Sequence, residues 1–222
     1  MNKKLWITTF ALVLASTAFA QNETNEADFR VVLTDDFRGA IITGYSGNAT
    51  HITIPSTIHG FPVREIGNAA FANNTVLTHV VIEEGIVRIG NPRTPGRYVG
   101  AFAHCTNLQS VVLPEGLVAI NAETFYRNES LTEITLPSTL RVIGPRAFAE
   151  SFSLVKVDFP ASIETIGASA FAGCTALVFV NIPDSVRKIR IVSHMNPAFV
   201  RTPRLSIHSQ AALRHRGYRG PF

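Results

Sequence analysis

Charged residues are scarce in this 222-residue chain: Asp, Glu, Lys and Arg together make up 16%, against 46% hydrophobic residues. A chain this apolar is not a disordered, solvating polymer, because such polymers combine low hydrophobicity with high charge. Twenty basic and 16 acidic residues leave a net charge of only +4, which on composition excludes a strongly basic nucleic-acid binder. Tyr and Trp are also rare, with four and one residues against 15 Phe, so most aromatic surface is expected in an apolar core.

Catalytic signatures are missing as well. The sequence contains no G-x-S-x-G, H-E-x-x-H, P-loop or dinucleotide-binding pattern, and its Ser, His and Asp residues follow no triad arrangement. We therefore predict no catalytic residue, no metal site and no cofactor. A hydrolase is kept only as a third alternative, which would need a pocket with convergent acid, base and nucleophile.

Residues 1–20 have the layout of a secretory signal peptide. Lys3 and Lys4 form a charged start, the stretch 5–15 is apolar, and residues 18–20 read Ala-Phe-Ala, a small-x-small cleavage site. A transmembrane anchor would need about 20 apolar residues, which is more than this stretch provides. We predict an exported mature chain that begins at Gln21.

A repeat organises the rest of the chain. It is anchored on Phe71, Phe102, Phe125, Phe148 and Phe171, which are spaced by 31, 23, 23 and 23 residues. In every copy a Leu follows six residues later, a Val or Ile nine residues later and a large apolar residue eleven residues later. Four of the five copies then have Pro, and further apolar residues stand 15 and 18 residues after each Phe.

These columns predict a solenoid. Pro inside almost every unit excludes a continuous helix, and the alternating Leu-x-x-Val-x-Ile segment predicts a short strand that ends at the Pro. One unit buries too little apolar surface by itself, whereas stacked units form a continuous core. The predicted fold is a β-rich solenoid of about six coils of roughly 23 residues, with short parallel strands forming one sheet on its concave face.

The segment from Ile166 to Pro183 reads I-G-x-x-A-F-x-x-C-x-x-L-x-x-V-x-I-P. This pattern resembles the BspA-like leucine-rich repeat of bacterial surface antigens and treponemal leucine-rich-repeat proteins. Residues 39–58 are similar to the N-terminal start of the family, and residues 209–222 to the ending of treponemal members. The resemblance covers roughly residues 39–189, and it implies the leucine-rich-repeat fold and a binding protein without naming a ligand.

Both ends of a solenoid need caps, since the end coils otherwise expose apolar faces. Residues 21–49 are predicted to form the N-terminal cap, with a β-hairpin over 29–45, and the repeats follow at 50–189. Residues 190–222 are predicted to form a C-terminal cap or tail with a short helix over 206–217. This end is basic: residues 185–222 contain eight Arg and Lys and no acid, whereas residues 21–184 contain ten basic and 16 acidic residues.

The two cysteines, Cys105 and Cys174, each follow a repeat Phe by three residues and lie three coils apart. At strand spacing this separation is about 15 Å, whereas a disulfide needs Cα atoms within about 7 Å. We therefore predict two reduced, buried thiols.

Solenoids usually bind on the concave sheet, so the outward strand positions are the predicted binding residues. These are His51, Thr53, His79, Val81, Ser110, Val112, Glu133, Thr135, Lys156, Asp158, Phe179 and Asn181. His51 and His79 on adjacent strands could share a metal, but they lack further ligands. Val81 and Val112 would form a small exposed apolar patch. The face has neither an aromatic ladder nor a basic stripe, so carbohydrate stacking and nucleic-acid binding are not favoured.

Two other features leave alternatives open. The insertion at 91–99 is rich in Pro, Gly and Arg; Arg93, Arg97 and Tyr98 would make it a contact loop, although loops also lengthen at little cost. The basic C-terminal end could contact an anionic membrane or glycan, pair with the acidic body of a second copy, or form a solvated cap.

These features together predict a non-catalytic module that binds a protein or envelope ligand through the concave face. We favour the periplasm, because the chain is short and shows no surface anchor. The alternative is a surface or secreted adhesin that binds host matrix or cell-surface proteins.

Overall fold

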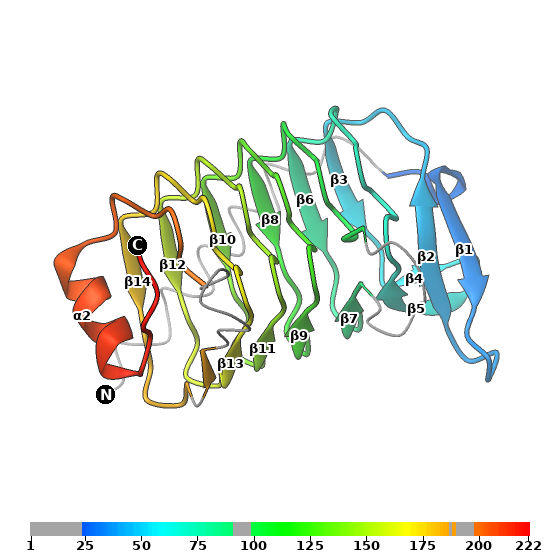
Figure 1. The fold of residues 1–222 in the computed structure, drawn as a ribbon. Helices are drawn as coiled ribbons and strands as arrows, with labels where there is room; N and C mark the ends of the chain where they lie inside the picture. Colours follow the sequence, from blue (N-terminus) through cyan, green and yellow to red (C-terminus); the bar gives the residue numbers. More distant parts are fainter. Residues whose placement is uncertain (1–23, 91–98, 187, 190–197) are drawn as a thin grey trace, which may run out of the picture.

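The computed structural model describes residues 24–90, 99–186, 188–189 and 198–222. The predicted signal peptide lies outside the described residues, as do Arg93, Arg97 and Tyr98 of the predicted contact loop. Figure 1 shows one stack of coils, which runs from strands β1 (Phe29–Leu33) and β2 (Ala40–Tyr45) to helix α2 (Ile207–His215).

Six short parallel strands form one sheet, which we call the front sheet. They come from successive coils and pair in chain order: β3 (His51–Ile54), β6 (His79–Ile82), β8 (Ser110–Val112), β10 (Glu133–Thr135), β12 (Lys156–Asp158) and β14 (Phe179–Asn181). Buried and exposed residues alternate along each strand, as in β8, where Val111 is buried and Val112 is exposed. The front sheet confirms the strands predicted from the repeat.

A second sheet, the rear sheet, runs along the same coils, so the prediction of a single sheet was wrong. In pairing order it contains β1, β2, β5 (Phe61–Ile66), β7 (Arg88–Ile89), β9 (Ala119–Ile120), β11 (Val142–Ile143), β13 (Thr165–Ile166) and β15 (Lys188–Ile189), and β4 (Thr57–Ile58) pairs with β5. Its two-residue strands are too short for alternation to show in a sequence. A fully buried Ile 18 residues after a repeat Phe, such as Ile143 or Ile166, fixes their register.

The Ala-Phe segments form a third surface, which we call the turn face. The N–H of each repeat Phe donates to a carbonyl of the next coil, from Phe125 to Ala147 and from Phe148 to Ala170 at 2.8 Å. Residues two before or two after the Phe often have positive φ, which turns the chain within a few residues. The turn face is thus as regular as the two sheets.

The core is a stack of phenylalanine rings. Neighbouring rings of Phe71, Phe102, Phe125, Phe148, Phe171 and Phe199 lie 4.7, 5.6, 5.3, 5.2 and 5.2 Å apart between centroids and are nearly parallel. Tyr45 stacks on Phe71 at one end, and Tyr218 packs edge-on against Phe199 at the other. Phe199 is a repeat position that the sequence columns missed, because 28 residues rather than 23 separate it from Phe171. The packed coils therefore extend beyond the predicted repeat boundary at 189.

The predicted N-terminal hairpin and C-terminal helix are both present in the described residues. At the N-terminal end β1 and β2 form the antiparallel hairpin, preceded by a short 3-10 helix, η1 (Glu26–Asp28). At the C-terminal end α2 contacts β14, and the Ser206 side chain caps the helix by accepting from Ser209 N–H. No helix in the described part of the chain is long and apolar enough to span a bilayer.

The cysteine prediction is confirmed: Cys105 and Cys174 are free and fully buried. The Cys174 thiol donates to Phe148 O in the preceding coil at 3.1 Å, and Cys105 makes the equivalent bond. Ser151 in the same column donates to Phe125 O at 3.1 Å. Residues at this position therefore donate a hydrogen bond to a buried carbonyl. Burial raises the pKa of both thiols to about 12.

Candidate binding site

The front sheet brings all twelve predicted strand residues onto one face, the front face, in two rows along the stack. The first row is His51, His79, Ser110, Glu133, Lys156 and Phe179, each paired with the next by Cα register. The second row is Thr53, Val81, Val112, Thr135, Asp158 and Asn181. All twelve are partly or fully exposed. Neighbouring strands lie about 4.8 Å apart, so each row is a continuous line of side chains.

Two histidines begin the first row. The rings of His51 and His79 stack with centroids 4.3 Å apart and planes within 4°. Each Nδ1 lies 2.9 Å from the hydroxyl of the preceding residue, Thr50 or Thr78. Partial burial, and then the neighbouring His51, lower the pKa of His79, so the neutral form of the His79 ring is favoured. Within the described ranges no three His, Cys, Asp or Glu residues gather in a group able to hold a metal ion.

The second row carries an apolar pair on β6 and β8, the second and third of the six strands. Val81 pairs with Val112 in register on adjacent strands, and Val112 is 37% exposed. The predicted valine patch is therefore present. Apolar side chains at the centre of a surface, with polar ones around them, are the usual composition of a protein interface.

The C-terminal third of the face is charged and internally bonded. Lys156 Nζ lies 2.6 Å from Asp158 Oδ2 and 5.7 Å from the ring centroid of Phe179. The Asn181 amide bonds to the backbone of Phe159, donating to its carbonyl at 3.0 Å and accepting from its N–H. Asn181 thus joins two coils, and Lys156 is the cation presented on this face.

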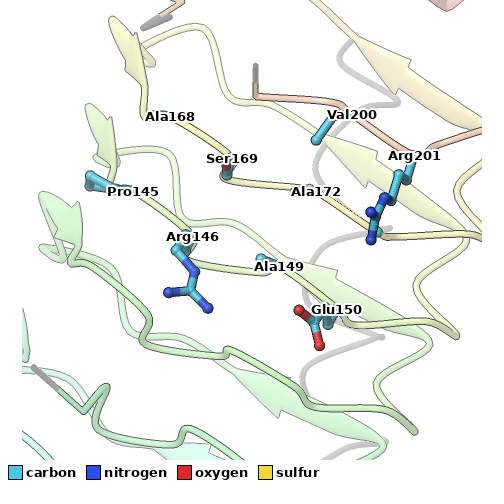
Figure 2. Close-up of a pocket in the computed structure, with 10 residues that line it drawn as sticks. Pro145, Arg146, Ala149, Glu150, Ala168, Ser169, Ala172, Val200 and Arg201 are labelled. Carbon is cyan, nitrogen blue, oxygen red and sulfur yellow. The ribbon is translucent and has the colours of Figure 1, made fainter. Parts of the chain in front are cut away.

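A groove lies on the turn face, away from all the predicted residues (Figure 2). Its volume is about 540 Å³ and its lining comes from three successive coils. The lining residues are Pro145, Arg146, Ala149, Glu150, Ala168, Ser169, Ala172, Gly173, Val200 and Arg201. A volume in this range is typical of ligand sites.

Ion pairs between coils hold one wall of this groove. Arg146 Nη1 lies 2.9 Å from Glu123 Oε1, and Arg127 Nε lies 2.6 Å from Glu150 Oε2. Between the two pairs stands Tyr126, whose hydroxyl donates to Glu150 Oε1 at 3.2 Å and whose ring centroid lies 4.4 Å from the Arg146 guanidinium carbon. The wall is therefore fixed before any ligand arrives.

The C-terminal end of the stack is basic, because residues 198–222 contain five Arg and no acid. Arg216 pairs with Asp184, and the Arg214 guanidinium lies 4.7 Å from the ring centroid of Phe222. The other three, Arg201, Arg204 and Arg219, are exposed and have no ion pair within the part of the chain that the structure describes.

The repeat columns and the stacked coils point to one family. The family model for the BspA type leucine rich repeat region matches in six copies, over residues 43–92 and 98–199. This chain belongs to the BspA-type leucine-rich-repeat family. Leucine-rich-repeat proteins generally mediate protein–protein interactions and are typically non-catalytic, and BspA-type proteins are typically extracellular or surface proteins.

Solved structures of other leucine-rich-repeat proteins are similar to this chain. The leucine-rich repeat protein of T. pallidum is 30% identical, with a TM-score of 0.71, and the match covers 90% of this chain and 99% of that one. A leucine-rich cell surface protein of Faecalibacterium prausnitzii A2-165 is 28% identical, with a TM-score of 0.62, over 77% of this chain and 45% of that one. A protein of Bacteroides ovatus ATCC 8483 is 24% identical, with a TM-score of 0.67, over 83% and 46%, and shows the fold alone. No curated protein matches the chain.

The groove is the feature that sequence reasoning missed in this BspA-type chain. Its floor lies at Ser169, Ala172 and Gly173, which occupy the same repeat positions as Glu123, Tyr126 and Arg127 two coils earlier. A signal was therefore present in two columns, which change from Glu123 and Arg127 to Ser169 and Gly173, although these columns lie outside the predicted strand positions.

Proposed function

We propose that the protein is a non-catalytic module of the bacterial cell envelope that binds a protein partner through the front face. The observation that carries this proposal is the pair of in-register rows on β3 to β14, with the Val81–Val112 patch on β6 and β8 and charged residues beyond it. Such a surface offers apolar contact and orienting charge together, as protein interfaces do.

The construction of the face supports binding by side chains. Hydrogen bonds occupy the backbone of both edge strands, from Thr53 N–H to Thr24 Oγ1 at one edge and between Val180 and Ser209 at the other. A partner that adds a strand to an open sheet edge is therefore disfavoured here. The stacked coils hold the face rigid, which lowers the ordering cost of binding.

The location is part of the proposal. The signal-peptide pattern at residues 1–20 supports export, and we place the protein in the periplasm, with a surface adhesin for host matrix or cell-surface proteins as the second candidate. The likeness to a protein described as a cell surface protein favours that second candidate. Protease digestion of intact cells, with permeabilised cells as control, separates them: protection until permeabilisation supports the periplasm, and digestion on intact cells supports the surface.

The basic C-terminal cap supports a weaker contact with an anionic surface. Its exposed Arg201, Arg204 and Arg219 attract negative charge without sequence specificity. The same cap could bind the acidic coils of a second copy. Concentration-dependent size measurements at low and high salt test for that oligomer, because screening weakens such pairing.

Variants of the front face test the binding proposal. A partner is first captured by cross-linking in intact cells and co-purified with the chain. Val81→Asp with Val112→Asp should abolish this co-purification without unfolding the chain, since both side chains point outward. Val87→Asp with Val118→Asp is the matched control, because these valines are exposed beside the strands of the rear sheet. Equal loss of the partner in both pairs would contradict the proposal.

A further inference from the structure

We propose that the turn-face groove is a second binding site, which takes an extended peptide segment bearing an acidic side chain and holds its carboxylate on Arg201. This site goes beyond the front-face proposal, because it lies on a different surface and shares no residue with it. Figure 2 shows Arg146 and Glu150 from one coil and Val200 and Arg201 from another on either side of the coil that carries Ser169 and Ala172.

The floor of the groove is shaped for a backbone to approach. Ala172 and Gly173 carry almost no side chain, and an added Cβ at Gly173 would lie 3.4 Å from Glu150 Cγ. The peptide groups of this coil are already bonded to its neighbours, with Glu150 N–H donating to Ala172 O at 2.7 Å and Gly173 N–H to Val200 O at 2.8 Å. A ligand therefore meets small side chains over a backbone already bonded between coils.

The two walls differ in charge. Arg146 and Glu150 on one wall are neutralised by Glu123 and Arg127 in the neighbouring coil. On the other wall Arg201 is exposed and has no ion pair in the described ranges. The groove thus has one uncompensated charge, which is positive and lies at one side.

This charge pattern selects the ligand. A guanidinium binds a carboxylate through two parallel hydrogen bonds, which gives both affinity and orientation. A polyphosphate or sulfated glycan would need several unpaired cations, whereas this groove offers one. The remaining lining is largely apolar, with Ala149, Ala168 and Val200, which suits the apolar side chains that flank the acidic residue of a polypeptide.

The repeat supplies a variant that should fill the groove without disturbing the fold. Ala172 occupies the column in which Tyr126 stands two coils earlier, so Ala172→Tyr places a side chain that the same turn already accommodates. The matched control is Ala72→Tyr, in the same column and also half-buried, but distant from the groove. For charge, Arg201→Glu is compared with Arg204→Glu, an exposed arginine of the same basic end that does not line the groove.

The test is a titration of the full mature chain with three probes: a synthetic peptide of alternating Asp and Ala, the same peptide with Lys for Asp, and inorganic polyphosphate. Alternation places the carboxylates on one side of an extended chain. Backbone amide chemical shifts report where each probe binds, and thermal unfolding checks that every variant is folded. We expect the Asp-Ala peptide to shift the amides of Ser169, Ala172 and Gly173, and the Lys-Ala peptide to leave them unchanged.

Arg201→Glu should weaken binding of the Asp-Ala peptide by about tenfold or more, as expected for loss of a charge-assisted contact. Ala172→Tyr should weaken it to a similar extent, because the added ring would occupy the groove. Ala72→Tyr and Arg204→Glu should change its affinity less than about twofold. Equal weakening by Arg201→Glu and Arg204→Glu would show diffuse attraction to the basic end and overturn the proposal. Absence of any shift in the groove, or tighter binding of polyphosphate there, would also overturn it. Val81→Asp with Val112→Asp should leave the peptide bound, which separates the two sites.

Discussion

Ser209 closes the open edge of the front sheet at Val180. Its hydroxyl accepts the Val180 N–H at 3.1 Å and donates to the Val180 carbonyl at 3.0 Å, so one side chain satisfies both backbone groups of the edge residue. Ser209 is itself fully buried at the first turn of α2, between the helix and β14.

Ser209→Ala should therefore lower the free energy of unfolding by about 1–3 kcal/mol, because it leaves two buried backbone groups without a partner. Unpaired edge strands also favour association. We expect a lower midpoint in urea and a larger apparent size at high concentration. Ser110→Ala, on the front face, is the control and should stay within about 0.5 kcal/mol; equal effects would show that the edge bond contributes nothing.

The phenylalanine stack should dominate stability. Phe125 lies fully buried between two nearly parallel rings, with centroids 5.6 and 5.3 Å away. Phe125→Ala should cost about 3–5 kcal/mol, from lost burial and the cavity left behind. Phe152→Ala, at a ring that is 40% exposed, should cost much less. Urea denaturation of both variants measures the difference, and similar costs would contradict the ring stack as the main support of the coils.

The buried thiols should make stability fall at high pH. Burial raises the pKa of Cys105 and Cys174 from 9.0 to about 12, so the unfolded chain releases these protons first. Their contribution is complete below pH 9 and is lost as the pH rises from 9 toward 12. The free energy of unfolding, measured by urea denaturation across this range, should fall more steeply with pH for the native sequence than for Cys105→Ser with Cys174→Ser.

That double variant should remain folded, because Ser151 already occupies the same column and bonds the same kind of carbonyl. A thiol-specific reagent should react with the native chain only after unfolding. Rapid reaction in the folded state would contradict the burial of the thiols.

The basic C-terminal cap should give salt-sensitive binding to anionic vesicles. Arg204→Gln with Arg219→Gln should reduce co-sedimentation, because each charge near the surface contributes about 1 kcal/mol to the free energy of binding to the vesicles. Arg30→Gln with Arg38→Gln in the N-terminal hairpin is the control. Binding that is indifferent to salt, or equally reduced by the hairpin variants, would leave the cap as a solvated end of the stack.

The sequence predicted those parts of the molecule that repeat in register. The columns around Phe102, Phe125, Phe148 and Phe171 are enough to place the front strands and the outward residues. They define the register of each strand, and a shift of one residue would move every side chain to the opposite face. Phe199 was not identified as a repeat position, because extra residues precede it and break the 23-residue spacing. The rear strands were not predicted, because a strand of two residues is too short to show the alternation of apolar and polar residues.

The groove could not be predicted in the same way. It exists because Ala172 is small and Gly173 lies between the longer side chains of Glu150 and Arg201 in the neighbouring coils, and a hollow depends on the spatial order of coils. The two front-face histidines were placed correctly on adjacent strands, but their ring stacking depends on side-chain packing that spacing alone does not specify.

The central claim is that the front face contacts the partner, and site-specific photo-crosslinking in intact cells tests it most directly. A photo-reactive residue at Val112, on the front face, is compared with one at Val118, a valine beside the rear sheet that is 46% exposed against 37% for Val112. We expect a discrete cross-linked product from position 112 that is absent from position 118. Cross-linking from position 118 with none from position 112 would contradict it.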